Sequence, residues 1–140
     1  EIVGTPEYIS PEQAFHSASV GPPSDVYSFG VVLFEWLAGR RPFEGTNVTS
    51  YIFMHTTEQA PPLLALAPAT PPELAALVER CLEKTPYTRP TAAELGLALA
   101  AIADALDAPA AETLVDRILT DGDGALSTAP TATGQRQAGG

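Results

Sequence analysis

The stretch from Ser24 to Ala38 constrains the fold more than any other, because most of its side chains are apolar or aromatic. A surface helix keeps a polar face, whereas a helix that is apolar nearly all round must be covered by other elements or by lipid. About fifteen residues are too few for a membrane span, which needs about twenty. A buried strand is the alternative, since Val31 and Val32 are β-branched, but the run is long for a strand. We therefore expect a central core helix of a soluble domain.

Signals at both ends of this stretch agree with a helix. Ser24 can accept hydrogen bonds from the first-turn N–H groups, and Asp25 places a negative charge at the positive end of the helix dipole. Gly39 provides a stop at the C-terminal end. The expected helix spans residues 24–38.

Length and composition indicate one helical domain. With 140 residues, 45% of them hydrophobic, the chain can bury a substantial core. Strand-type alternation is almost absent, and 14 prolines with many alanines indicate short helices separated by rigid turns. The expected fold class is all-α.

Charge and cysteine content exclude several classes of function. A net charge of -10 argues against nucleic acid as a partner, because phosphate binding needs a clustered basic face. The single cysteine, Cys81, excludes an internal disulfide and fits a reducing compartment. No signal peptide or transmembrane run is visible, so we expect a cytoplasmic location. The chain begins at Glu1 without methionine, so the expectation of a cytoplasmic location does not exclude a targeting segment upstream of Glu1.

Four residues are placed to cap further helices: Ser10, Asn47, Thr70 and Thr91. In all but Asn47, a Gln or Glu three residues later completes a capping box. The helices expected after these caps cover residues 11–16, 48–55, 71–82 and 92–106.

The apolar spacing predicts which faces of these helices are buried. The clearest case has apolar residues at i, i+3, i+4, i+7 and i+8, namely Leu74, Leu77, Val78, Cys81 and Leu82. The expected faces of its neighbours are Val48, Tyr51, Ile52 and Phe53 in one helix, and Leu95, Leu99, Ile102 and Leu106 in the other.

The remaining segments are expected to be less regular. Residues 60–68 are broken by prolines, and 107–119 can add a helical turn or two after the main domain. Residues 120–140 contain one large apolar side chain, Leu126, and cannot offset the entropy of ordering. We expect that last segment to be disordered.

Three stretches, in order, resemble the C-terminal lobe of eukaryotic-type protein kinases, especially the Ser/Thr kinases of bacteria. Residues 4–12, GTPEYISPE, are similar to the end of the activation segment, with Ser-Pro-Glu in place of the usual Ala-Pro-Glu. Residues 24–43 resemble the helix that the family calls F, and residues 81–90 its motif between helices H and I. The resemblance covers residues 1–106 and implies helices of the types EF, F, G, H and I, without the N-terminal lobe.

The resemblance assigns roles by position. Gly4, Thr5, Pro6, Glu7 and Tyr8 match the loop that binds the substrate residue after the phosphoacceptor. Thr5 matches the residue beside the reacting hydroxyl, which favours Ser/Thr specificity.

Two further roles concern the scaffold. Glu12 and Arg89 match a buried structural ion pair, in which a planar guanidinium and a carboxylate can bond bidentately. Asp25 matches the helix F aspartate that anchors the catalytic loop, although a plain helix cap explains it almost as well.

The family's catalytic motifs are missing from this sequence. It has no Gly-rich loop, strand lysine, His-Arg-Asp or Asp-Phe-Gly, so we assign no catalytic residue to it. A complete kinase would bind ATP and magnesium and phosphorylate protein Ser/Thr, whereas this part should hold no cofactor and be inactive alone. Its expected partners are protein substrates and the remainder of the kinase domain. The alternative is a catalytically inactive protein-binding module that uses the groove near residues 48–55.

Metal sites are not expected. His16 and His55 have no second ligand at a suitable spacing, and Cys81 lies on an apolar helix face. The run from Asp121 to Ser127 matches the middle of an EF-hand loop but lacks the first aspartate and the bidentate glutamate. We expect a flexible turn there rather than a calcium site.

Overall fold

The structure is a computed structural model that describes residues 5–15, 20–106 and 108–122. Within these ranges it contains helices and turns and no strand, which confirms the all-α prediction. The helices are α1 (Pro11–Ala14), α2 (Pro22–Ala38), α3 (Val48–Thr57), α4 (Leu63–Leu66), α5 (Pro72–Cys81), α6 (Ala92–Ala105) and α7 (Ala108–Gly122), with 3-10 turns η1 (Pro6–Tyr8) and η2 (Pro86–Thr88).

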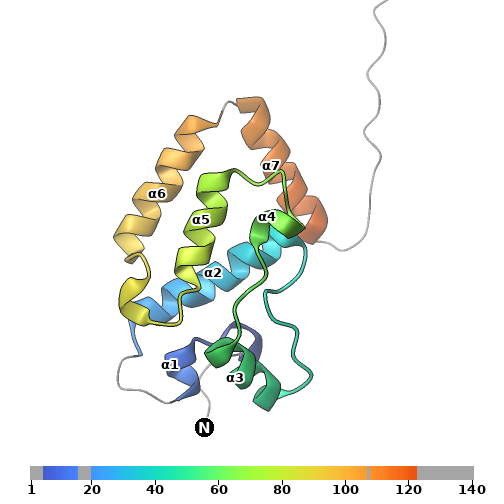
Figure 1. The fold of residues 1–140 in the computed structure, drawn as a ribbon. Coiled ribbons are helices and arrows are strands. Elements are labelled where there is room, and N and C mark those ends of the chain that lie inside the picture. The colour runs from blue at the N-terminus through green and yellow to red at the C-terminus, as the bar shows by residue number, and fades with distance from the viewer. Residues whose placement is uncertain (1–4, 16–19, 107, 123–140) are drawn as a thin grey trace, which may run out of the picture.

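Helix α2 lies at the centre of the molecule (Figure 1). On one side α5 packs against α2, with α6 beside α5, and α4 and α7 also contact α2. On the other side lie α1, α3 and the N-terminal turn η1, which contacts both α2 and α3. The chain therefore brings its N-terminal loop against α2 and α3 rather than leaving it at the periphery.

The main core forms along one face of α2, as the prediction of a central core helix requires. Tyr27, Val31 and Phe34 are fully buried at positions i, i+4 and i+7, and they cluster with residues of α4 and α5 such as Leu63 and Val78. The opposite face remains exposed in part: Phe29 and Trp36 expose 38% and 48% of their surface. The helix is thus apolar nearly all round, and the elements on its two sides leave uncovered the face that carries Phe29 and Trp36.

Close approach of α2 and α5 depends on Gly30. A Cβ atom at this position would lie 2.6 Å from the Cβ of Cys81, which is closer than real Cβ atoms come. Cys81 itself is fully buried, as predicted for the apolar face of α5. Any larger residue at position 30 would push the two helices apart.

The start of α2 differs from the prediction, whereas its end agrees. The helix begins at Pro22, after Gly21 as N-cap, because Pro at the first helical position is pre-organised for the helix. Ser24 therefore lies inside the first turn and does not cap it; its hydroxyl donates to Glu12 instead. Gly39 ends the helix with φ of 73°, the left-handed conformation expected of a C-terminal glycine.

The other caps agree in three cases of four. Ser10 forms both hydrogen bonds of the predicted capping box, and Asn47 forms a box with Ser50 that was not predicted. Of the box predicted at Thr91, the structure shows the bond from the backbone N–H of Glu94 to the Thr91 hydroxyl. The predicted cap by Thr70 is wrong: α5 begins one residue later, after Pro71, and the buried Thr70 hydroxyl has no hydrogen-bond partner among the residues that the structure describes.

The buried face of α3 is also rotated relative to the prediction. Tyr51 is buried as expected, but Val48 and Phe53 expose 44% and 58% of their surface, and the inward position one turn after Tyr51 is His55. The apolar pattern misplaced this face because it gave no weight to a buried histidine.

Two segments are more helical than predicted. Residues 60–68 include the short helix α4, whose Leu63 is fully buried in the main core. Helix α7 occupies the region where a turn or two was expected, and it continues to Gly122, past the start of the segment predicted to be disordered. Residues 123–140 and the calcium-loop motif beyond Gly122 lie outside the described residues, as do Gly4 and His16. No helix in the described ranges has the length and hydropathy that a membrane crossing requires.

Candidate functional site

The N-terminal loop, Thr5 to Tyr8, forms a single 3-10 turn that is closed by a hydrogen bond from the Tyr8 N–H to the Thr5 carbonyl, at 3.0 Å. Thr5 is exposed, and Pro6, Glu7 and Tyr8 are half-buried. A turn this short has little stability of its own, so its place depends on contacts with other elements.

Helix α2 anchors the end of this loop at Tyr8. The Ser28 hydroxyl donates to the Tyr8 carbonyl at 2.7 Å, and the Tyr8 hydroxyl donates to Glu35 Oε2 at 2.7 Å. The hydrogen bond with Glu35 raises the pKa of Tyr8. Arg41 Nε lies 3.6 Å from the same Glu35 oxygen, and its guanidinium lies over the Tyr8 ring. Two residues of α2 thus hold Tyr8: Ser28 bonds its backbone carbonyl, and Glu35 bonds its side chain.

Helix α3 anchors the loop through His55. Its Nε2 donates to the Glu7 carbonyl at 3.1 Å, and its Nδ1 accepts from the Tyr27 hydroxyl at 2.7 Å. The carbonyl can only accept, so Nε2 carries the proton and Nδ1 is the acceptor. The ring is fully buried, and burial lowers the pKa of His55 to about 4 and raises the pKa of Tyr27. The sequence interpretation considered His55 only as a metal ligand and missed this role, for which its spacing of four from Tyr51 was the one available signal.

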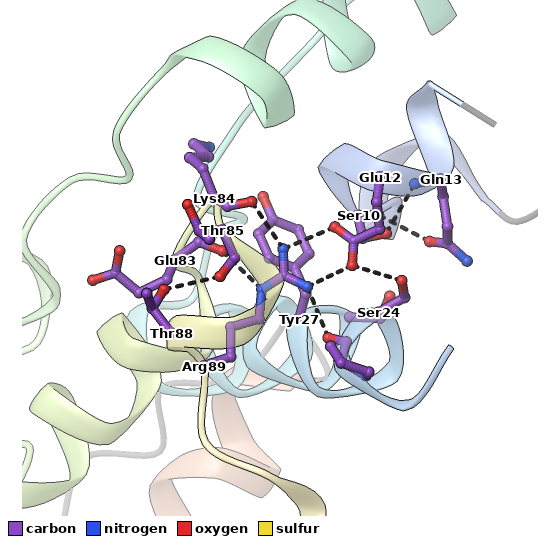
Figure 2. Close-up of polar contacts among 12 residues, drawn as sticks. Ser10, Glu12, Gln13, Ser24, Tyr27, Glu83, Lys84, Thr85, Thr88 and Arg89 are labelled. Atoms are coloured by element: carbon purple, nitrogen blue, oxygen red, sulfur yellow. Dashed lines mark hydrogen bonds and ion pairs between the residues drawn. The ribbon is translucent and has the colours of Figure 1, made fainter. Parts of the chain in front are cut away.

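Figure 2 shows Glu12 of α1 and Arg89, the residue after η2, facing each other. Arg89 Nη1 lies 2.6 Å from Glu12 Oε2, and Nη2 lies 2.9 Å from Oε1, so the pair is bidentate. Both residues are buried, with 6% and 5% of their surface exposed. The ion pair inferred from the resemblance is therefore formed across 77 residues of sequence.

The surroundings of this pair satisfy both charges. Arg89 also donates to three backbone carbonyls, those of Pro23, Glu83 and Lys84. Burial alone would raise the pKa of Glu12, but hydrogen bonds from Arg89 and from the Ser24 hydroxyl outweigh it and lower that pKa. The pair connects α1, the first turn of α2 and the turn before α6, and so fixes the segment that follows the loop.

The outer face of α2 carries the remaining predicted residue. Asp25 is exposed in the first turn, and Phe29, Val32 and Trp36 follow at i+4, i+7 and i+11. We call these four residues the outer stripe of α2. No part of the described chain buries Phe29 or Trp36, and the catalytic loop that Asp25 would anchor has no counterpart in this sequence.

The described residues offer no set of donors that fits a metal. Nowhere in residues 5–15, 20–106 and 108–122 do three His, Cys, Asp or Glu side chains gather in a way that could hold an ion. Burial raises the pKa of the Cys81 thiol to about 11, which makes it a core side chain rather than a nucleophile. What these contacts do is hold the Thr5–Tyr8 loop in one place against α2 and α3.

Comparison with known proteins places the chain among protein kinases. Residues 1–97 match the family described as the protein kinase domain. Relatives include the serine/threonine-protein kinases PksC of Streptomyces coelicolor, 42% identical over 93 residues, and pkn2 of Myxococcus xanthus, 44% identical over 110 residues. These alignments cover 66% and 76% of this chain but 16% and 13% of the two relatives. PknA of Mycobacterium tuberculosis is 45% identical over 89 residues, which are 63% of this chain and 20% of that protein. The chain thus spans a fifth or less of the length of these relatives.

Proposed function

Because this chain belongs to the protein kinase domain family, we propose that it supplies the substrate-side loop and the helical scaffold of a Ser/Thr protein kinase. The activity of the whole would be transfer of the ATP γ-phosphate to Ser or Thr of a protein. Residues 1–106 would form the kinase part, and the following helix would extend it, with Leu114 of α7 packed against the main core.

The observation that supports this function best is the anchoring of the loop from Thr5 to Tyr8. Phosphoryl transfer depends mainly on positioning, so a substrate loop has to be held in one place. Here a three-residue turn is bonded to two residues of α2 and one of α3, and the Glu12–Arg89 pair fixes the next segment. The exposed Thr5 would lie beside the substrate hydroxyl and favour Ser or Thr.

The outer stripe of α2 is the surface that we assign to the remainder of the kinase domain. Phe29 and Trp36 are large apolar side chains that lie exposed on one face of α2, and exposed apolar patches mark sites of contact with other protein surfaces. Full burial of an exposed side chain of this size contributes about 1.5–3 kcal/mol, so burying the 38% and 48% that remain exposed would contribute about 0.6–1.5 kcal/mol each to association. Asp25 at the end of the stripe would accept hydrogen bonds from the catalytic-loop backbone.

We assign ATP and magnesium to the whole kinase rather than to the residues described here. The sequence contains neither His-Arg-Asp nor Asp-Phe-Gly, and the described carboxylates do not gather into a magnesium site. The described carboxylates do not fit a magnesium ion, so we assign no step of phosphoryl transfer to them.

Reconstitution tests this function. The chain is mixed with the preceding part of the kinase domain of the Streptomyces coelicolor relative, and transfer of ³²P from labelled ATP to casein is measured. We expect activity only when both parts are present, and association that Trp36→Asp weakens at least tenfold, because a charge would replace a buried aromatic ring. Leu97→Asp is the matched control, since Leu97 is 74% exposed and belongs to a different helix, α6.

Two results would contradict the proposal. Absence of any association would remove the assignment of the outer stripe. Association without phosphoryl transfer would favour the alternative, a protein-binding module of the kinase fold.

A further inference from the structure

We propose that His55 is a positioning residue, which sets the place of the Thr5–Tyr8 loop by bridging it to the buried core through its two ring nitrogens. The inference rests on the proposed function, because that function makes this loop the substrate loop. The resemblance assigned roles to the side chains of the loop itself and to the Glu12–Arg89 pair. To these we add a residue of α3 that holds the loop in place.

The bridge joins segments far apart in the sequence. Nδ1 bonds to the Tyr27 hydroxyl across 28 residues, and Nε2 bonds to the Glu7 carbonyl across 48 residues. Tyr27 is fully buried in the main core, beside the Arg89 guanidinium at 4.8 Å from its ring. The loop carbonyl is therefore connected to the buried main core through one imidazole.

Neighbouring rings hold the imidazole in this orientation. Phe43 packs against it edge to face with ring centroids 5.0 Å apart, and Tyr51 stacks on it at 6.3 Å. The Lys84 ammonium lies 4.6 Å from the Phe43 ring centroid and donates to the Met54 carbonyl, next to His55 in α3. The ring cannot rotate without disturbing its contacts with Phe43 and Tyr51 and its bonds to Tyr27 and Glu7.

The bridge acts on a different part of the loop from the α2 anchors. Ser28 and Glu35 both hold Tyr8, whereas His55 holds Glu7. Without the imidazole, Tyr8 would remain bonded to α2. Glu7, however, would lose the hydrogen bond from His55 to its carbonyl, the only one that the described residues outside the turn make to it. The Tyr8 N–H, which closes that turn, is thus the natural reporter of the bridge.

Hydrogen exchange of the 140-residue chain, measured by NMR, tests the bridge without any need for activity. Exchange of the Tyr8 amide is compared with that of Val78 in the middle of α5, in the original chain and in Tyr27→Phe, His55→Phe and the double variant. Tyr87→Phe is the matched control, because it removes the same hydroxyl from a ring that is 84% exposed. In the original chain, ¹⁵N signals of the His55 ring should show the neutral tautomer protonated at Nε2.

We expect His55→Phe to accelerate Tyr8 exchange about tenfold relative to Val78, the factor that one lost hydrogen bond gives. It should also lower the melting temperature, since the Tyr27 hydroxyl is left buried and unpaired. In the double variant that hydroxyl is gone, so the melting temperature should recover in part while Tyr8 exchange stays fast. This separation distinguishes positioning of the loop from a contribution to stability alone.

Unchanged Tyr8 exchange in His55→Phe, or exchange that recovers together with the melting temperature in the double variant, would overturn the inference. Failure of the kinase reconstitution is a separate outcome: with a normal exchange response, it would remove the substrate role of the loop and leave His55 as the residue that positions it.

Discussion

Replacing Arg89 with alanine is the most severe single perturbation that the structure predicts. The substitution removes both hydrogen bonds to Glu12 and leaves that carboxylate buried, with the Ser24 hydroxyl as its remaining side-chain partner among the described residues. It also removes the donor to the carbonyls of Pro23, Glu83 and Lys84. Loss of one partner of a buried ion pair costs about 3–5 kcal/mol, because the other charge is left uncompensated.

This cost corresponds to a large thermal shift. For a domain of this size, each kcal/mol changes the melting temperature by roughly 3–5 °C, so a cost of about 3–5 kcal/mol means that Arg89→Ala should lower it by about 9–25 °C. Circular dichroism during heating measures the shift. Arg80→Ala is the control, because Arg80 is exposed on α5 and its loss should change the melting temperature by a few degrees at most.

The pH dependence supplies a second test of the same pair. The pKa of Glu12 is lowered in the folded chain from an ordinary value of 4.5, so the pair stabilises the fold above that pH and ceases to do so as the pH falls through the folded pKa. The difference between the original chain and Arg89→Ala should therefore shrink in acid. A melting temperature of Arg89→Ala equal to that of Arg80→Ala at neutral pH would refute the reasoning.

Three further predictions concern other parts of the fold. Gly30→Ala should destabilise the chain by about 1–3 kcal/mol, because the new Cβ would overlap Cys81, whereas Gly96→Ala should stabilise it by up to about 1 kcal/mol, since nothing lies within 4 Å of that site; equal effects in urea titrations would contradict the packing of α2 on α5. Burial lowers the pKa of His55 from 6.5 to about 4, so the unfolded chain binds more protons between these values, and stability should fall by roughly 3 kcal/mol as the pH drops through them. His55→Phe should remove this dependence from pH-dependent melting curves, and a dependence that persists would assign it to other groups. Trp36, the single tryptophan, should emit as a partly exposed indole, and its emission should shift to the blue when the complementary kinase part binds the outer stripe; no shift on binding would place the interface elsewhere.

The sequence predicted best those features that depend on a few neighbouring residues. The caps at Ser10 and Asn47 need only a side chain and a backbone amide three positions apart, and both form as expected; at Asn47 the Ser50 side chain also completes a capping box that was not predicted. The apolar face of α5 follows in the same way from its period. Thr70 failed as a cap because two consecutive prolines allow α5 to start one residue later than the local motif suggested.

The anchors of the loop could not be predicted from local patterns. Ser24 was interpreted as a cap, yet its hydroxyl donates to Glu12 because α1 lies against the first turn of α2. His55 was assigned no role, because a lone histidine on a helix face gives no sign of partners 28 and 48 residues away. Glu12 and Arg89 were paired only through the resemblance to kinases, since charge pattern alone cannot match residues separated by 77 positions.

The two faces of α2 explain why the sequence predicted a core helix here but did not predict which of its faces would be exposed. Its inner face packs against α4 and α5 and makes the chain a folded unit, whereas its outer stripe leaves Phe29 and Trp36 exposed. An amphipathic helix would have revealed a single buried face by its period, but a helix that is apolar all round gives the same signal whether one face or both are covered. Packing within the described chain does not require the outer face of α2 to be apolar, and the proposed contact with the remainder of the kinase domain would explain why it is. On that reasoning, substitutions on the inner face, such as Val31→Ala, should lower the stability of the chain and leave its affinity for the remainder of the kinase domain unchanged. Trp36→Asp should instead weaken that affinity and leave the stability unchanged.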